Sequence, residues 1–522
     1  MNTSPRRRVS IAFALLATTR GLTACGGADE EAGEGSADGQ EKAQWWWRTR
    51  RPTTAPAATA APTPSPSPSP GPTPSPSPTP APTPAPTPGP TPAPTAAPTS
   101  APTPSPTPAP PAGSLPTWVP AAGEVAVLTN ANGGLANRFR DIVAPYYEPF
   151  YSKKIVNDYS GAFKNPHWGL WGACLFFGGG HAATNDNMVA IAEYGTSAIT
   201  FRRVCDPTAW FGTGTDATTR YRNSVDNANA LLNLTYMEST IDGKPGAPHS
   251  YGSGDIVGPE HGGAACGTYL QVISAAVNFR NDAGAVAAHE LALADTTTPS
   301  SQRSWRRLSN STGNVPGAAP LMTSLVGPQR RVYIVPNGMA VPGSVHWFDY
   351  TQRIWAQGTG VGFSYDEADG FDSGALFHVP SRNLLVCMYP VAGRLKIQWM
   401  DVSAAQPTLG AAVTLSQPLT LALPWSAACW CLHNNRIIVA GVSGDNTAVY
   451  EIEIPAALSN PWPVARAPLG GGQTFAPLDA SLGYGLTWKK FQYDEKVRAI
   501  VYMPLAASEG DDRIWVYRPR GT

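Results

Sequence analysis

The sequence predicts an all-β protein, a six-bladed β-propeller preceded by a disordered linker, and three observations support this class. From Ala121 onward, strand-length apolar runs alternate with turn residues, and no long stretch has a helical period. One four-strand pattern recurs through this region, as in repeat proteins. The chain of 522 residues holds 51 glycines, yet only 14% of its residues are charged, which favours turns over long surface helices.

The first residues are typical of an export signal. Three arginines at residues 6–8 precede the apolar run 9–17, which is too short to span a bilayer as a permanent helix. The motif LTAC at residues 22–25 resembles the lipobox of bacterial lipoproteins, which implies that Cys25 becomes a lipidated N-terminus. We therefore expect a signal peptide over 1–25 and export, with lipid anchoring to the cell envelope. The alternative is an ordinary secretory signal with a chance cysteine.

Residues 26–114 are expected to form a linker without a core. An acidic, small-residue stretch leads into a long tract of proline, threonine, serine and alanine. Proline removes backbone donors and favours the polyproline II conformation, so this tract is predicted to be a stiff, solvated spacer. The folded domain is then expected over 115–522.

The last of the six repeats ends one strand short. The first repeat reads KIVNDYSGAF, GLWGACLFFGGGH, NMVAIAEY and AITFRRVCDP, whereas the last holds only GLTWKKFQYDE, RAIVYMPLA and RIWVYRP. The segment GEVAVLT, residues 123–129, precedes the first repeat and has no partner there. We expect it to complete the last blade, because closing the ring removes exposed strand edges. Val125 and Val127 are predicted to bury one face of this strand.

Two other architectures fit parts of the pattern. A seventh blade would be possible if the insertion at residues 208–247 contained one, and a two-sheet sandwich would also be all-β. The sandwich explains the repeat poorly. In the fourth repeat, AAVTLSQP at residues 411–418 is expected to supply the outermost strand.

The first and last repeats resemble those of bacterial kelch-type propellers, which are similar to the central domain of galactose oxidase. The resemblance rests on FFGGGHAATNDN, PHSYGSGDIV and the terminal YGLTWKKFQYDEKVRAIVYMPL, and it covers roughly residues 121–522. It implies a propeller fold. No stretch matches the catalytic motifs of the copper-radical oxidases, so the resemblance does not imply oxidase chemistry.

The candidate binding residues lie on two neighbouring repeats. The glycines at 178–180 do not match a phosphate loop, because a strand rather than a helix follows them. The polar residues beside them and at the start of the second repeat are expected near the axis on one face, where they could bind a polar ligand or a metal. The alternative is that the two histidines lock neighbouring blades through backbone hydrogen bonds. The candidates are His181, Asn185, Asp186, His249, Tyr251 and Asp255.

No complete catalytic motif is found. HELAL at residues 289–293 begins like a zincin helix, but Leu293 stands where the second histidine is required, and the segment is predicted to be a strand. DEADGFD at 366–372 departs from the spacing of a calcium loop. The cysteines of the folded part cannot be paired from sequence, and several lie in apolar runs where a thiol is a small buried group. They are Cys174, Cys205, Cys266, Cys387, Cys429 and Cys431.

These observations favour a binding module for a glycan or a protein at the cell surface, expected to be monomeric. The 37 basic and 37 acidic residues balance, which gives no electrostatic basis for binding nucleic acid. Membrane contact is expected only through the N-terminal lipid anchor, and no cofactor is identified. The alternatives are a polysaccharide-active or metal-dependent oxidase-type enzyme, and a structural surface protein.

Overall fold

The computed structural model describes most of the chain from residue 114 to the C-terminus. The described residues are 114–142, 161–177, 187–207, 244–245, 252–274, 286–309, 320–336, 345–358, 363, 375–391, 393–421, 427–445, 447–472, 489–503 and 512–522. All of them belong to one compact unit, residues 98–522.

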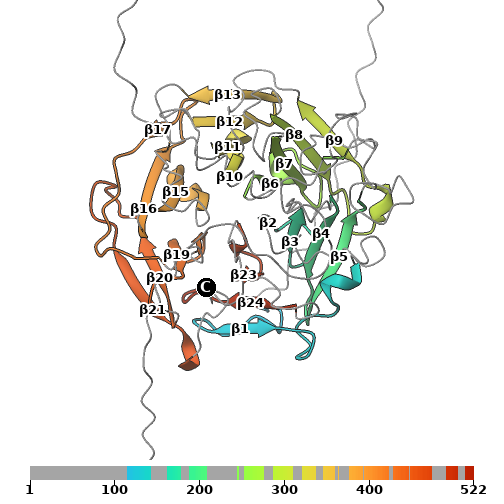
Figure 1. The fold of residues 1–522 in the computed structure, drawn as a ribbon, viewed down its shortest axis with the longest axis horizontal. Helices are drawn as coiled ribbons and strands as arrows, with labels where there is room; N and C mark the ends of the chain where they lie inside the picture. Colours follow the sequence, from blue (N-terminus) through green and yellow to red (C-terminus); the bar gives the residue numbers. More distant parts are fainter. Residues whose placement is uncertain are drawn as a thin grey trace, which may run out of the picture. The chain divides into compact units, whose positions relative to one another are not determined.

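Six four-stranded antiparallel sheets form a ring, in agreement with the predicted propeller (Figure 1). Each blade is a meander whose first strand is innermost, except that blade 6 takes its outermost strand from the N-terminal side. The strands of blades 1 to 3 are β2 (Gly161–Asn165), β3 (Ala173–Phe177), β4 (Val189–Tyr194) and β5 (Ile199–Cys205); β6 (Gly254–Val257), β7 (Thr268–Ser274), β8 (Val286–Ala292) and β9 (Trp305–Ser309); and β10 (Pro320–Val326), β11 (Arg331–Pro336), β12 (Val345–Asp349) and β13 (Ile354–Gly358). The strands of blades 4 to 6 are β14 (Ala375–Val379), β15 (Leu384–Val391), β16 (Arg394–Asp401) and β17 (Thr408–Leu409); β18 (Ala427–Cys431), β19 (Arg436–Ala440), β20 (Ala448–Glu453) and β21 (Val464–Pro468); and β22 (Phe491–Asp494), β23 (Ala499–Tyr502), β24 (Ile514–Tyr517) and β1 (Val125–Leu128).

The predicted closing strand is confirmed. β1 pairs antiparallel with β24, with Val125 opposite Tyr517 and Leu128 opposite Ile514. Val125 and Val127 share one face of β1, as predicted, and pack into the core shared with blade 5. The opposite face is also packed, because the outermost strand of a blade still lies between two neighbours. Ala126 and Leu128 contact the core shared with blade 1.

Neither alternative architecture holds. The innermost strands β2 and β6 pack directly against each other, and blades 1 and 2 share one apolar core that contains Phe163 and Tyr269. The same contacts continue from β6 to β10, β14, β18 and β22. Gln492 then joins blade 6 to blade 1, because its Nε2 donates to the Ala162 carbonyl at 2.6 Å. The six described blades therefore close the ring without a seventh between blades 1 and 2.

The outermost strand of blade 4 lies elsewhere than predicted. β17 is only Thr408–Leu409, and it ends at Gly410, whose Cα passes so close to the Trp399 ring that a Cβ would clash. The predicted strand 411–418 runs instead toward blade 5, where Leu415 forms a parallel bridge to Trp462. Its alternating apolar residues are satisfied there, by packing with Trp462 in the core of blades 4 and 5.

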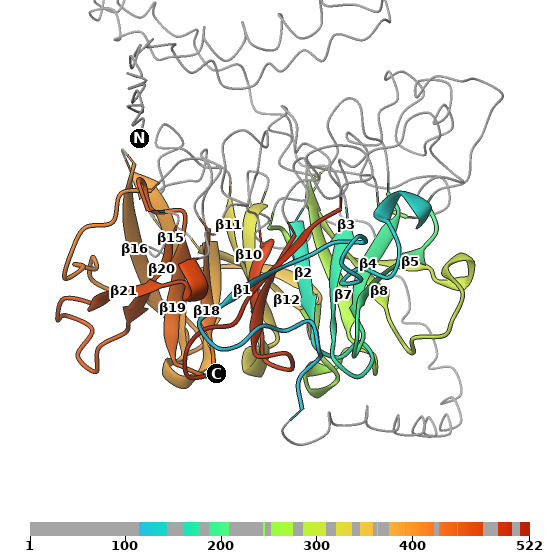
Figure 2. The same cartoon turned by 90° about the horizontal axis from the view of Figure 1, so that it is seen from below.

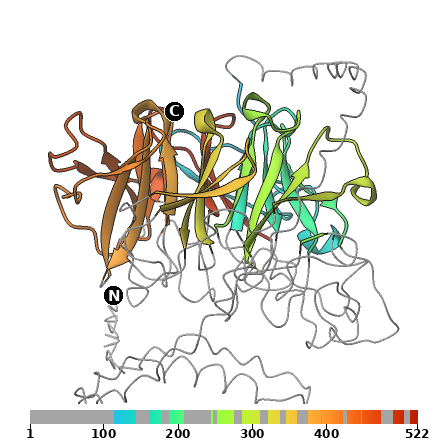
Figure 3. The same ribbon diagram turned by 90° about the horizontal axis from the view of Figure 1, so that it is seen from above.

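The connections between strands differ in length on the two faces of the disc. Each innermost strand begins on one face, here called the connection face, and the first hairpin of each blade turns on the other, the turn face (Figures 2 and 3). The turn after β10 is residues 327–330, and that after β18 is 432–435. By contrast, the connection from β5 to β6 spans residues 206–253, and that from β21 to β22 spans 469–490.

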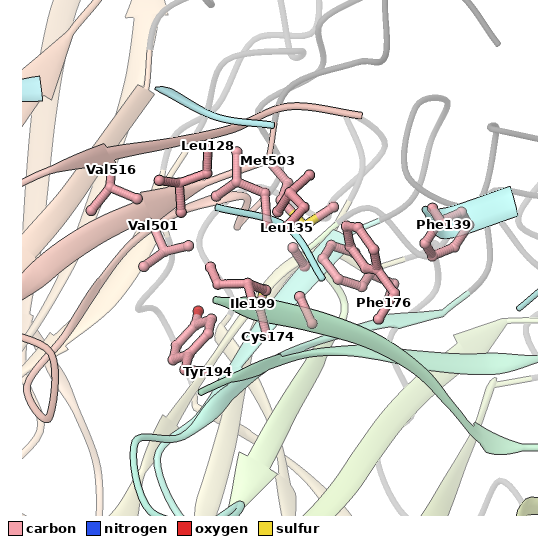
Figure 4. Close-up of a cluster of buried hydrophobic side chains, with 14 of the residues drawn as sticks. Leu128, Leu135, Phe139, Cys174, Phe176, Tyr194, Ile199, Val501, Met503 and Val516 are labelled. Carbon is pink, nitrogen blue, oxygen red and sulfur yellow. The ribbon is translucent and has the colours of Figure 1, made fainter. Parts of the chain in front are cut away.

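The apolar core lies between blades. Figure 4 shows the cluster that joins blade 6 to blade 1, with Leu128 and Val516 on the side of blade 6 and Phe176 on the side of blade 1. The six cysteines expected in the folded part are all buried, and no disulfide links them within the described residues. Cys429 and Cys431 share one face of β18, as their spacing predicted.

Candidate functional site

Of the six predicted binding residues, the structure describes Asp255. The other five lie outside the described residues, and their role stays a prediction: His181, Asn185, Asp186, His249 and Tyr251. The segment DEADGFD at 366–372 also lies outside them. HELAL lies within β8 and is a strand, as predicted.

Asp255 lies near the start of β6 and joins three blades. Its Oδ2 accepts hydrogen bonds from Lys489 Nζ at 2.9 Å and from the Leu325 backbone N–H at 2.8 Å. Its Oδ1 accepts the N–H of Ile256 at 3.0 Å. The carboxylate of blade 2 is therefore held by donors from blades 2, 3 and 6.

Lys489 crosses the axis of the ring. It lies just before β22 in blade 6, yet Nζ donates to the Gly254 carbonyl at 2.7 Å and to Thr323 Oγ1 at 3.2 Å, besides Asp255. Thr323 belongs to blade 3, which lies opposite blade 6 in a six-membered ring. Nζ also lies 5.8 Å from the centre of the Phe163 ring of blade 1. An ammonium has three hydrogens, and these three acceptors use all of them.

The charge interactions and the backbone conformation of Lys489 both show that the surrounding structure holds this residue in place. Burial lowers the pKa of Lys489, while the negative charge and hydrogen bond of Asp255 oppose that shift. The residue adopts a φ of 47°, in the left-handed region that non-glycine residues rarely occupy. Tertiary contacts therefore hold this residue in place. We call Gly254, Asp255, Thr323 and Lys489 the axial lysine network.

A second polar layer lies toward the turn face. Lys164 Nζ, at the end of β2, contacts Glu495 Oε2 at 2.6 Å across the junction of blades 1 and 6. The charge of Lys164 lowers the pKa of Glu495. Asp494 beside it is buried, and that burial raises its pKa to about 7. This layer ties the two blades between which the ring closes.

Two histidines approach one carboxylate on the turn face. Glu260 Oε1 lies 3.8 Å from His167 Nε2 and 3.5 Å from His261 Nε2. Burial lowers the pKa of His167, which favours its neutral form. Nevertheless, no group of three His, Cys, Asp or Glu side chains among the described residues has an arrangement that could hold a metal ion. The described part of the chain therefore does not support a metal centre.

Sequence reasoning missed Lys489 and Thr323. Lys489 is one of two adjacent lysines in WKKFQYDE, and nothing in that stretch distinguishes a buried lysine from a solvated one. Thr323 lies in the apolar run PLMTSLV, and nothing in that run indicates a polar contact. In the structure its Oγ1 contacts the carbonyl oxygens of Gly252 and Gly254 at 3.0 and 2.9 Å. Both contacts join residues far apart in the sequence, which no local pattern could indicate.

Comparison with known proteins gives only distant structural likenesses. No protein-family model matches the chain, and no curated protein matches it. Among solved structures, the PQQ-bound aldose sugar dehydrogenase of Streptomyces coelicolor matches with 8% identity and a TM-score of 0.38, over 76% of this chain and 98% of that one. The major allergen Mala s 1 of Malassezia sympodialis matches with 8% identity and a TM-score of 0.38, over 70% of this chain and 92% of that one.

A xyloglucanase from Xanthomonas campestris matches with 13% identity and a TM-score of 0.30, over 61% of this chain and 48% of that one. At such identities, no activity is carried over from any of them. The class that the topology defines is a six-bladed β-propeller closed by an N-terminal strand. Within the part of the chain that the structure describes, no helix is long and apolar enough to cross a membrane.

Proposed function

We propose that this propeller is a non-catalytic binding module that takes a glycan or a protein on its connection face. The observation that carries the proposal is the asymmetry of the two faces. The connections 206–253 and 469–490 leave the connection face, whereas the first hairpins of blades 3 and 5 turn within 327–330 and 432–435. Loops positioned by a rigid scaffold carry binding residues more often than the scaffold itself does. The sequence also predicts the candidates His181 and His249 on this face.

The axial lysine network supports the same proposal. Its charged groups, Asp255 and Lys489, are paired with each other rather than presented singly to a substrate. A catalytic lysine or carboxylate must be able to exchange its proton with a ligand. Here all three ammonium hydrogens have acceptors in the protein. The network thus holds the centre of the disc in place beneath the connection face.

We further propose that the propeller is of the kelch type and is displayed from the cell envelope. The motif LTAC supports a lipid anchor at Cys25, and the proline-rich tract that follows would hold the propeller away from that anchor. Replacing the cysteine, Cys25→Ser, should abolish palmitate labelling and move the protein from the membrane fraction to the soluble one. Unchanged fractionation would contradict the anchor and leave the binding proposal intact.

Glycan arrays, pull-downs from surface extracts and turnover assays with the full chain test the binding proposal. We expect a ligand that is retained without turnover, and the paired changes His181→Ala and Asp186→Ala should weaken its binding. The matched control is Leu432→Ser, because Leu432 is 45% exposed on a hairpin of the turn face. Turnover of a polysaccharide, or a transition metal bound at about one per chain, would favour the enzyme instead. Retention of no ligand by any assay would favour a structural surface protein.

A further inference from the structure

The first hairpins of the six blades form a rim around the axis on the turn face. Each joins the innermost strand of a blade to its second strand, and all six lie on the same side of the ring (Figures 2 and 3). We call them the hairpin rim. They are residues 166–172, 258–267, 327–330, 380–383, 432–435 and 495–498.

Contacts between neighbouring hairpins connect the rim. Glu260 of blade 2 lies beside the hairpin of blade 1, as described above. Ser381 Oγ of blade 4 donates to Asn435 Oδ1 of blade 5 at 3.2 Å. Lys496 Nζ of blade 6 donates to the Gly169 carbonyl of blade 1 at 3.4 Å. The hairpins therefore present one connected surface rather than six separate turns.

The hairpin rim carries more positive than negative charge, although the whole chain is neutral. Its cations are Arg330, Arg382, Lys496 and Arg498, and its carboxylates are Glu260 and Glu495. Both carboxylates have basic neighbours, because Glu495 contacts Lys164 at 2.6 Å and Glu260 lies beside two histidines. By contrast, none of the four cations forms an ion pair with a carboxylate among the described residues. The rim therefore offers positive charge to a partner.

Arg330 and Arg498 occupy equivalent positions at the ends of their hairpins. Both residues are exposed, and their φ values of 52° and 51° lie in the left-handed region. Blades 4 and 5 have Asn383 and Asn435 at the same position, with φ values of 50° and 55°. The hairpin accepts asparagine there, so the two arginines add a charge that the turn itself does not require.

Arg382 supplies a third exposed charge, at the junction of blades 4 and 5. Its Nη1 and Nη2 donate to the carbonyls of Pro455 and Ala456 at 3.1 and 3.0 Å. Neutral carbonyls hold the guanidinium in place without cancelling its charge. The fourth cation, Lys496, is half-buried, and burial lowers its pKa, so the three arginines carry most of the charge of the rim.

The chain also enters the folded domain on the turn face. The Thr117 N–H donates to the Thr196 carbonyl at 2.9 Å, and Trp118 Nε1 donates to the Gly195 carbonyl at 2.7 Å. These acceptors belong to the hairpin 195–198 between β4 and β5, which turns on the same face as the first hairpins. The predicted linker and lipid anchor therefore precede a point on this face.

An anionic bilayer fits this arrangement better than a linear polymer. The cations come from blades 3, 4 and 6 and lie around an axis rather than along a line, so a flat surface can meet them together. Each basic side chain near anionic headgroups strengthens membrane binding by about fivefold. Docking by this face also places the start of the domain next to the bilayer from which the predicted linker comes.

We propose that the hairpin rim is a docking surface for an anionic phospholipid bilayer, with Arg330, Arg382 and Arg498 against the headgroups. The contact goes beyond the proposed function and beyond the expectation that the lipid anchor alone contacts the membrane. It uses the opposite face from the proposed ligand site and leaves the connection face directed away from the bilayer. It also needs no lipidation, so a chain without the anchor can test it.

Vesicle co-sedimentation of the full chain carrying Cys25→Ser tests the rim without the anchor. Vesicles with equal parts of phosphatidylglycerol and phosphatidylcholine should retain the chain, and phosphatidylcholine alone should not. Raising sodium chloride from about 0.1 M to about 1 M should release it, because salt screens exposed charges. Arg330→Asn combined with Arg498→Asn should weaken binding by roughly thirtyfold, and Arg382→Gln alone by roughly fivefold. Asparagine suits the left-handed backbone, as blades 4 and 5 show.

The matched control is Arg394→Gln combined with Lys396→Gln. Both residues are exposed near the start of β16, at the end of blade 4 away from the rim, and neither forms an ion pair among the described residues. The control should bind vesicles like the Cys25→Ser chain. Equal losses in the two double variants, or unchanged binding of the rim variants, would overturn the proposal. Equal retention by phosphatidylcholine vesicles would overturn it too, and soluble polyglutamate bound as tightly as vesicles would assign the rim to an acidic polymer instead.

Discussion

At the scale of single residues, Lys489 gives the propeller a connection that apolar packing between neighbouring blades cannot supply. It joins blade 6 to blades 2 and 3 through side-chain contacts of 2.7 to 3.2 Å. Neighbouring blades are held by their shared cores, but blades on opposite sides of the ring share none. A buried ion pair contributes little when compared with apolar packing, yet breaking it leaves one charge without its partner.

We therefore expect Lys489→Met to lower the free energy of unfolding by about 2–4 kcal/mol. The change leaves the Asp255 carboxylate with its backbone donors but without its counter-charge. Urea unfolding at pH 7 measures the effect, with Lys396→Met, an exposed lysine of β16, as the control. The double variant with Asp255→Asn should lose less than the sum of the single losses. Additive losses would show that the two residues do not act as a pair.

His289 and His378 predict how stability depends on pH. Burial lowers their pKa values to about 3 and about 4, below the ordinary value of 6.5. Between pH 6.5 and these lowered pKa values, the histidines of the unfolded chain bind protons and those of the folded chain do not, so a falling pH favours unfolding. The stability is complete above pH 6.5 and is lost as the pH falls toward 4. Melting temperatures from pH 7.5 to 4.5 should fall less steeply for His289→Leu than for the native chain, and parallel curves would contradict a neutral buried imidazole.

The sequence placed Asp255 near the axis but could not show its partner. The local pattern HSYGSGD predicted an innermost strand from His249, whereas the described strand begins at Gly254, near the end of that segment. The partner Lys489 lies in another blade, and its position depends on the closure of the whole ring.

At the scale of elements, the closing strand could be predicted from the sequence, whereas the outermost strand of blade 4 could not. The unpaired GEVAVLT segment identified β1, because only one strand was missing and one was unclaimed. The outermost strand of blade 4 was misplaced, since an alternating apolar pattern does not specify which neighbour it packs against. Four first hairpins end on a non-glycine residue in the left-handed region, so no glycine marks that position of the turn. These residues are Arg330, Asn383, Asn435 and Arg498.

Deleting residues 121–130 tests the closing strand. The outer edge of β24 loses its partner, and the cores on both sides of β1 lose Val125 and Leu128. We expect a steep loss of soluble protein or a fall of more than about 10 °C in melting temperature, since each buried side chain removed costs on the order of 2–4 kcal/mol.

The matching deletion of residues 26–113 should leave the melting temperature nearly unchanged, because the sequence predicts no core there. Scanning calorimetry of both deletions against the full chain makes the comparison. Equal effects of the two deletions would mean that β1 does not close the ring as described.

At the scale of the whole molecule, six blades make a disc whose two faces differ. The predicted blade count holds because neighbouring innermost strands pack directly, and blades 1 and 2 leave no place for a seventh between them. The same closure brings every first hairpin to the turn face and every connection between blades to the other. Composition and repeat spacing could predict this asymmetry, because it depends only on connection length. They could not identify the ligand, which depends on side chains that meet in space.

Hydrogen–deuterium exchange of the full chain with and without its captured ligand tests the central proposal most directly. If the ligand binds the connection face, protection should appear in peptides covering 178–186, 206–253 and 469–490. The turn-face peptides 258–267, 327–330 and 432–435 should exchange at unchanged rates. Protection confined to the turn-face peptides, with the first set unchanged, would contradict the assignment of binding to the connection face.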